Sequence, residues 1–206
     1  LRFFIVLLAV PAFAERTVTN LNQYVLFGGW NLPAGSTGID LGSNTIITGN
    51  GLVGSTQSIK STGNLNLTGG IFSGGKINLS NNNTISGRVS AASGANPIFQ
   101  AGTYFKLGGN ADVNGNISIG TTGSVVSGIV KQPSGATYTG PAANKVTGTP
   151  DLPVFPAIPP ITNFANFPYG TVSVTSGVIT PGKYKYLNPT GSKTITFSGP
   201  GIYVFK

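Results

Sequence analysis

The chain has 206 residues, of which only 8% are charged, and its formal net charge is +8. Globular proteins carry roughly 25% charged residues, so this surface must be built largely from Asn, Thr, Ser and Gly. The chain contains no Cys and no His, which excludes disulfides, thiolate metal sites, His ligands for zinc and a Ser-His-Asp triad.

Residues 1–14 have the layout of a secretory signal peptide. Arg2 precedes the apolar run Phe3–Val10, and Pro11 then leads into the Ala-Phe-Ala cleavage sequence at 12–14. The apolar run is shorter than the roughly 20 residues that span a bilayer, so we expect no transmembrane span in the mature chain. The alternative is a hydrophobic segment that is retained for assembly or anchoring. Either way, we expect a secreted or cell-surface protein.

A repeat dominates residues 15–132, which we predict to form a β-solenoid. Four stretches can be superposed when they start at Ile39, Ile59, Ile77 and Phe105, and the last interval is longer than the two before it. Each stretch has an asparagine at its fifth position after the start and a glycine at its tenth: Asn44, Asn64, Asn82 and Asn110, and Gly49, Gly69, Gly87 and Gly115. A period of roughly 18–20 residues with short strands between Asn and Gly corners is typical of a parallel solenoid.

A finer period of six residues predicts the shape of each coil. Pairs of core residues at i and i+2, such as Leu65 and Leu67, place two side chains on one face of a short strand. Three such strands per turn predict a three-sided β-helix with aliphatic residues inside. Asn and Gly accept left-handed backbone at low cost, so we interpret the two columns as structural corners. We expect no catalytic, cofactor-binding or metal-binding residues among them, and no cofactor.

The longer interval between Ile77 and Phe105 predicts an inserted loop at 93–102, which is either a plain loop or a binding position at a corner. Residues 133–170 hold eight of the 14 prolines, and the stretch Asp151–Pro160 within them must be extended because each X-Pro step disfavours a helix. We interpret them as a strap packed along the flank of the solenoid, with a disordered linker as the alternative.

Residues 171–206 resume the strand pattern. The sequence Thr180–Tyr184 returns one coil length later as Gly199–Tyr203, and each Pro-Gly turn leads into a strand. We predict a further solenoid segment that is incomplete at Lys206, so that the chain is a fragment or another chain covers this end. We also interpret Trp30, which follows two glycines, as a cap over the opposite end of the core.

Carboxylates are too few to favour an enzyme. Glycoside hydrolysis needs two carboxylates that flank the bond, and Asp40, Asp112 and Asp151 are the candidates in the mature chain apart from Glu15 at its new terminus. Asp40 and Asp112 occupy different offsets of the repeat, on outward strand positions, so we expect them to lie apart. A polysaccharide lyase is accordingly the least favoured function.

The repeat Ile77–Val89 resembles those of bacterial secreted β-helix surface proteins, and it is also similar to the polymer-forming bactofilin family. The Pro-Gly-x-Tyr sequences near Tyr184 and Tyr203 resemble repeats of the former group. The likeness covers residues 24–206 loosely. Bactofilins are cytosolic and lack a signal peptide, so the N-terminus departs from them. The resemblance implies a structural or adhesive role and transfers no catalytic residues.

The sequence thus predicts a non-enzymatic structural or adhesive protein of the bacterial cell surface or extracellular matrix. Self-assembly into filaments through open solenoid ends is one hypothesis, because unpaired strand edges bind other strands. Other surface proteins and polysaccharide are further possible partners, whereas the scattered basic residues do not predict nucleic-acid binding. The alternatives are an ice-binding face, for which Thr-x-Thr sequences are isolated, and a carbohydrate-binding module that uses Phe99, Tyr104 and Tyr138.

Overall fold

The computed structural model describes residues 23–29, 32–155, 171–180, 182–185, 195–198 and 203–204. These residues form β-strands that pair in parallel. The chain divides into two compact units, Leu1–Pro156 and Ala157–Lys206, which are described separately below. The predicted signal peptide and Trp30 lie outside the described residues. No helix in the described part is long and apolar enough to span a bilayer.

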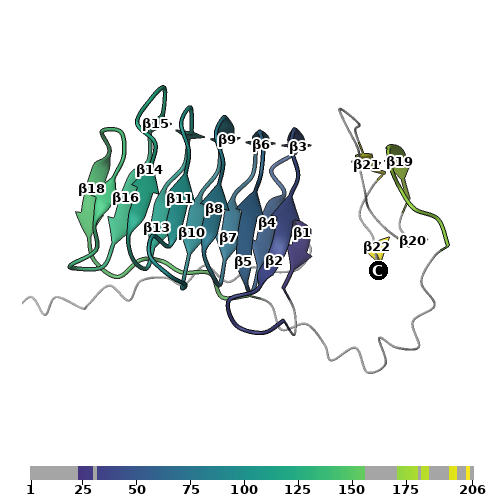
Figure 1. Ribbon diagram of the computed structural model, residues 1–206, viewed down its shortest axis with the longest axis horizontal. Coiled ribbons are helices and arrows are strands. Elements are labelled where there is room, and N and C mark those ends of the chain that lie inside the picture. Colours follow the sequence, from purple (N-terminus) through teal and green to yellow (C-terminus); the bar gives the residue numbers. More distant parts are fainter. Residues whose placement is uncertain are drawn as a thin grey trace, which may run out of the picture. The chain divides into compact units, whose positions relative to one another are not determined.

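The first unit is a three-sided parallel β-solenoid (Figure 1). The first five turns each contribute one strand to each of three sheets, so sheet neighbours are three strands apart in the chain as far as β17. The last strand, β18, pairs with β16, and no strand of the five-stranded sheet lies between them. The seven-stranded sheet contains β1 (Tyr24–Gly28), β4 (Leu52–Ser55), β7 (Ile71–Ser73), β10 (Val89–Ala91), β13 (Ala111–Val113), β16 (Ile129–Gln132) and β18 (Asn144–Thr147). The predicted fold class is confirmed.

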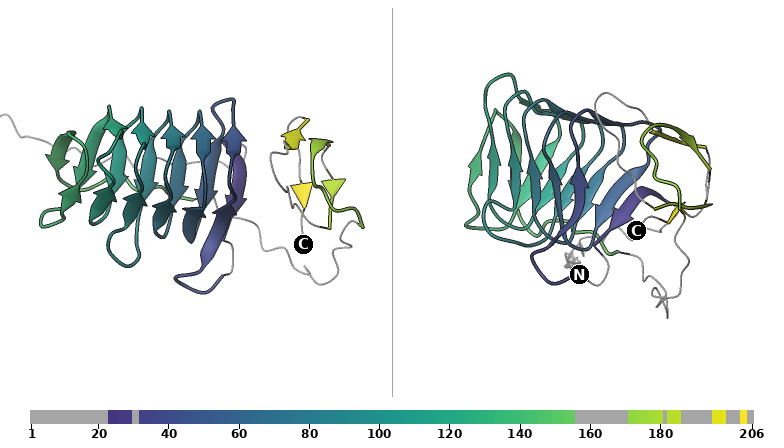
Figure 2. Two further views of the ribbon diagram at one scale, coloured as in Figure 1. Left: turned by 45° about the horizontal axis from the view of Figure 1, so that its top comes forward. Right: turned by 45° about the vertical axis from the view of Figure 1, so that its right-hand side comes forward.

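The other two sheets complete the triangle, as the turned views in Figure 2 show. The six-stranded sheet contains β2 (Thr37–Leu41), β5 (Ser58–Ser61), β8 (Ile77–Leu79), β11 (Phe99–Ala101), β14 (Ile117–Ile119) and β17 (Tyr138–Thr139). The five-stranded sheet contains β3 (Thr45–Ile47), β6 (Leu65–Leu67), β9 (Asn83–Ile85), β12 (Lys106–Leu107) and β15 (Val125–Val126).

The core consists of aliphatic columns that run from coil to coil. In-register pairing places each inward residue on its counterpart one coil away. One column per sheet reads Val53, Ile71, Val89, Ala111 and Val130; Ile39, Ile59, Ile77, Phe99 and Ile117; and Ile47, Leu67, Ile85, Leu107 and Val126. Burial of one such side chain stabilises the fold by about 1.5–3 kcal/mol, so the columns explain the six-residue period of the sequence.

The register of the fourth coil differs from the repeat alignment. Ile77 pairs with Phe99 and not with Phe105, so this step is longer than the preceding one, from Ile59 to Ile77, by four residues. The four additional residues lie in the loop at 92–98. The predicted loop at 93–102 is therefore wrong at its C-terminal end, because β11 occupies Phe99–Ala101 with Phe99 fully buried.

The solenoid also continues past residue 132, where its predicted boundary lies. Strand β17 pairs with β14, and β18 pairs with β16. The local phase differs too, since Val130 and Gln132 are buried in β16 whereas Ile129 is 40% exposed. When it is continued by twelve residues from Ile117 and Ile119, the six-residue period predicts that Ile129 and Lys131 point inward, which is wrong. The step from Ala111 to Val130 is one residue longer than that from Ile59 to Ile77, and this shifts the phase.

After β18 the chain turns back along the outer face of the seven-stranded sheet (Figure 1). We call residues 148–155 the strap. It begins beside the last coil, where the Gly148 amide donates to the Gln132 carbonyl, and it reaches the first coil, where the rings of Phe155 and Phe27 are 5.8 Å apart. The remainder of the proline-rich segment, 156–170, lies outside the described residues.

The second unit contains two further parallel pairs. Strand β19 (Gly177–Ile179) pairs with β21 (Ile195–Phe197), and β20 (Gly182–Lys183) pairs with β22 (Tyr203–Val204). Gly177 lies opposite Ile195 and Gly182 opposite Tyr203, so both pairs are separated by about one coil of the chain. The predicted spacing of about one coil thus recurs here. The register differs from the sequence repeat, which aligns Tyr184 with Tyr203, because Tyr203 pairs with Gly182.

Candidate functional site

The solenoid presents three outer faces, and two of them are open. Alternation along each strand turns one residue outward between two inward ones. On the six-stranded sheet the outward column is Asp40, Lys60, Asn78, Gln100, Ser118 and Thr139; on the five-stranded sheet it is Ile46, Asn66, Thr84, Lys106 and Val125. These residues are exposed or half-buried, so ligands or partners have access to both faces.

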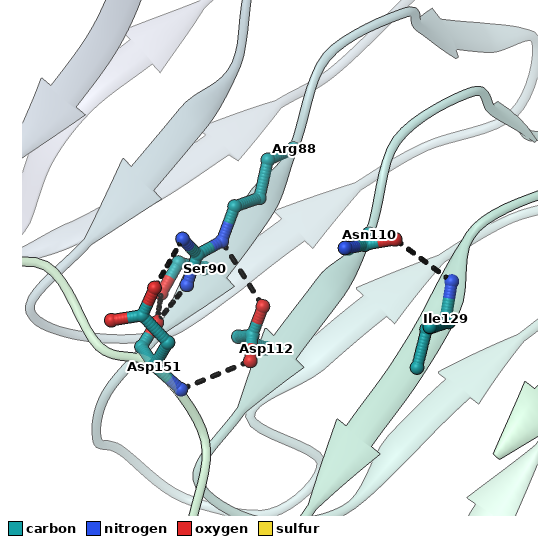
Figure 3. A network of polar contacts seen from close by, with 6 residues as sticks. All are labelled: Arg88, Ser90, Asn110, Asp112, Ile129 and Asp151. Carbon is teal, nitrogen blue, oxygen red and sulfur yellow. Dashed lines mark hydrogen bonds and ion pairs between the residues drawn. The ribbon is translucent and has the colours of Figure 1, made fainter. Parts of the chain in front are cut away.

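The strap covers the third face and is anchored by an ionic network (Figure 3). Arg88 Nε lies 3.0 Å from Asp112 Oδ2, and Arg88 Nη1 lies 2.6 Å from Asp151 Oδ2. The guanidinium also donates to the Asp151 carbonyl, and the Asp151 amide donates to Asp112 Oδ1 at 2.9 Å. Ser90 Oγ donates to the same carbonyl at 3.2 Å. One arginine thus holds two carboxylates that are distant from each other in the chain.

Aromatic side chains extend this covered face toward the first coil. The rings of Tyr24 and Phe27 lie 5.0 Å apart, edge to face, and Phe27 contacts Phe155 of the strap. The Arg88 guanidinium lies 6.0 Å from the centre of the buried Phe72 ring. The strap is therefore held by apolar contacts as well as by charge, and the part of this face that lies beneath it is unavailable to a ligand while the strap is in place.

The predicted asparagine column is real for three of its four members. Asn44, Asn64 and Asn82 occupy the same corner, because the residues that follow them pair in register. The Asn64 amide donates to Asn44 Oδ1 at 3.1 Å. Asn44 and Asn82 adopt left-handed backbone, with φ of 59° and 58°. Register then continues this corner with Tyr104 (φ 58°) and Gly123 (φ 65°).

Asn110 lies at a different corner, directly before β13, where its Oδ1 accepts from the Ile129 amide at 3.0 Å (Figure 3). The glycine column is split in the same way. A Cβ on Gly87 would lie 2.5 Å from the Gly69 backbone, so these two glycines stack, and Gly109 continues their column. Gly115 instead faces the Ile98 side chain, and Gly49 (φ 85°) borders open space. The repeat alignment therefore joins corners that the fold separates.

No protein-family model, curated protein or solved structure matches this chain.

The three candidate carboxylates do not meet at one place. Asp40 is exposed on the six-stranded sheet and pairs with Lys60 at 2.9 Å. Asp112 and Asp151 lie together beneath the strap, and Arg88 pairs with both. Asp40 and Asp112 thus lie on two different sheets, apart from each other as predicted. The contact between Asp112 and Asp151 could not be predicted, because nothing in the repeat indicates where the strap lies.

Among the described residues, no three acidic side chains are close enough together to hold a metal ion. A shallow groove crosses the five-stranded face between coils, and its lining includes Thr84, Lys106 and Val125. The lining also includes Ile85 and Leu107, and Lys106 is its one charged residue.

The three aromatic candidates for carbohydrate binding have different environments. Phe99 is fully buried and packs against Phe105, with ring centres 5.5 Å apart, so its assignment to a binding face is wrong. Tyr138 is half-buried at the end of the solenoid, and burial raises the pKa of its hydroxyl. Tyr104 is 52% exposed, and its ring covers Gly123, where a Cβ would lie 2.3 Å from it. Of the three, Tyr104 alone presents its ring at an accessible corner.

Proposed function

We propose that this protein is a non-enzymatic structural or adhesive component of a bacterial surface or extracellular matrix. A parallel stack of coils resists bending, and its faces repeat similar groups about every 4.8 Å. The observation that carries the proposal is the pair of open faces that extend along the stack. The outward column of the six-stranded face is made mostly of uncharged polar residues, and that of the five-stranded face combines polar residues with the exposed side chains of Ile46 and Val125. The signal-like residues 1–14 supply the case for export.

The open faces suggest how such a protein would make contacts. Asn78 on the six-stranded face and Asn66 on the five-stranded face are both exposed and point outward from the middle of the stack. Amides of this kind donate and accept hydrogen bonds at once, so each can bind a second polar surface without strong charge attraction, and on the six-stranded face Gln100 adds a further amide beside Asn78. Adhesion or lateral self-association would use one of these faces.

The proposal is tested with the purified full chain and matched surface variants. Negative-stain microscopy over a concentration series reports self-assembly, and retention of bacteria or beads coated with the protein reports adhesion. Asn78→Lys and Asn66→Lys each add one charge to one open face and leave the core intact. We expect one of them to weaken the contact severalfold while the other has little effect. Dispersed particles at every concentration together with no adhesion would refute the proposal.

Export is tested separately by deletion of residues 1–14. We expect the full chain to be found outside the cytoplasm and the shortened chain to remain inside. Equal distribution of both would contradict the surface location without affecting the structural role.

A carbohydrate-binding module is the second candidate, and Tyr104 favours it. Left-handed backbone is unusual for a bulky residue, and such outliers gather at binding sites. Other coils have Asn or Gly at this corner, which would serve the turn equally well. A sugar ring could stack on the exposed aromatic face. Glycan-array binding that Tyr104→Asn abolishes would support this function, and an array without binding would reject it.

A further inference from the structure

The last coil of the solenoid places polar side chains where the earlier coils place aliphatic ones. Along the seven-stranded sheet the inward column ends with Val130 and then Lys145. Along the six-stranded sheet Ile117 is followed by Tyr138. Gln132 is also 7% exposed and thus buried, and its amide donates to the Gly115 and Thr137 carbonyls. In the columns that end in Lys145 and Tyr138, the change from apolar to polar therefore takes place between one coil and the next, at the end of the stack.

These polar groups contact one another across the open end of the core. The Tyr138 hydroxyl donates to the Pro141 carbonyl at 2.8 Å, which fixes the ring. The Lys145 ammonium lies 5.7 Å from the centre of that ring, within the range of a cation–π contact. Ala143, which lies between Tyr138 and Lys145 in the sequence, packs against the core. The end of the core is thus covered by a tyrosine ring with a positive charge over it.

The strand that carries Lys145 is otherwise a good template for another chain. All four residues of β18 are exposed, and Val146 is 43% exposed on its outward side. Within the described residues β18 has a sheet neighbour on one side only. An edge of this kind presents unpaired amide and carbonyl groups, which invite pairing with a second strand.

We propose that Lys145 and Tyr138 form a cap that prevents a second copy of this chain from stacking its edge strand on β18. A stacked coil would place an apolar residue over the position of Lys145 and drive the ammonium into the core. Burial of an unpaired charge is strongly unfavourable. An inward-pointing lysine on an edge strand is also a known means by which β-proteins avoid edge-to-edge association. This inference does not depend on the proposed function.

The cap is tested by replacement of the charge in the full chain. Lys145→Thr and Lys145→Val remove it, Lys145→Arg keeps it, and Lys131→Val removes a lysine from the outward side of the neighbouring strand as a control. Sedimentation velocity over a wide concentration range measures association. We expect the two neutral variants at 145 to associate about a hundredfold more tightly than the wild type, whereas the Arg variant and the control behave like the wild type.

The position of the new contact is tested with a fluorescent label. The chain has no cysteine, so Val146→Cys offers a single attachment point on β18. In the Lys145→Thr background an environment-sensitive dye should respond as concentration rises, and in the wild-type background it should not. Circular dichroism and urea midpoints confirm that each variant folds. The cap is refuted if the neutral variants associate no more tightly than the wild type, or if the dye does not respond.

The outcomes separate this inference from the proposed function. If the wild type forms filaments and substitution of Lys145 changes nothing, the cap is wrong and the structural role stands. If the wild type stays dispersed and the neutral variants associate through β18, the cap is right and assembly through this solenoid end is excluded for the natural chain. Any natural self-association would then use another surface.

Discussion

The middle of the solenoid and its ends use the same columns differently. Phe99 and Tyr138 are two coils apart in one inward column, yet the first is fully buried and the second half-buried with its hydroxyl bonded. Ala111 and Lys145 are likewise two coils apart in one inward column of the seven-stranded sheet. An apolar residue is thus required only where a further coil stacks above it. At the end of the stack the same position is occupied by a polar group.

Ion pairs differ between the two regions in the same way. In the middle, Arg88 is 22% exposed and pairs with Asp112, whose side chain is 9% exposed beneath the strap. In the first two coils, the Lys60–Asp40 pair is 43% and 51% exposed. Water screens the second pair and is largely excluded from the first, so similar distances carry different energies.

The largest expected effect tests the column itself. Phe99→Ala should lower the free energy of unfolding by about 3–5 kcal/mol, because it removes a fully buried ring and leaves a cavity. Tyr138→Ala, in the same column at the end, should cost less than about 2 kcal/mol. Urea unfolding followed by circular dichroism measures both. Equal losses would mean that the end of the stack is packed as tightly as its middle.

The second effect concerns the strap. Arg88→Gln leaves two carboxylates beneath the strap without their cation and should cost about 3 kcal/mol. The strap should also become sensitive to proteolysis within 148–155. Lys60→Gln removes a comparable pair from an open face and should cost less than about 1 kcal/mol. If the two variants unfold at the same urea concentration, the strap does not shield its anchor from water.

The third effect compares two corners. A Cβ on Gly87 would meet the Gly69 backbone at 2.5 Å, so Gly87→Ala should destabilise the protein by about 1–3 kcal/mol. Gly42, in the first coil, has no atom within 4 Å of such a Cβ. Gly42→Ala should therefore be neutral, or stabilising by up to about 1 kcal/mol, through the unfolded chain. Thermal melts of both variants measure the difference, and a loss at Gly42 would contradict it.

The smallest effect is a dependence on alkaline pH. Burial raises the pKa of Tyr138 above its ordinary value of 10.0, so the folded state favours the neutral phenol. Its contribution to stability is complete below the unfolded pKa and is lost as the pH rises through the higher folded pKa. The wild type should thus lose stability more steeply than Tyr138→Phe above about pH 10. Tyr104→Phe, at an exposed corner, is the control, and parallel curves for all three proteins would refute the effect.

The fold class follows from the sequence because the period and the aliphatic pairs are local signals. The register after Asn82 does not follow from them. Matching by residue type assigns Asn110 to the asparagine column of Asn44 and Asn82. In the structure Tyr104 occupies the next position of that corner, with φ of 58°. Burial of Phe99 beneath the preceding coil outweighs the preference of one corner for Asn or Gly, and the four additional residues are accommodated in the loop at 92–98.

The site depends on contacts that the sequence does not encode locally. The prolines predict an extended strap, but the face that it covers is set by Arg88 and Asp151, which are far apart in the chain. Asp112 is predicted to point outward, and it does, yet the strap buries it. The cap could not be foreseen either, because Lys145 lies in a segment that the proline content separates from the solenoid.

The return of the strap has a mechanical consequence. Because Phe155 lies beside Phe27, the described chain enters and leaves the first unit at the same end of the stack. A force applied between these two points would not stretch the solenoid along its axis. It would peel the strap away from the solenoid, beginning at the first coil. The contact between Phe155 and Phe27 would therefore break before the Arg88 network, and the coils themselves would carry little of the tension.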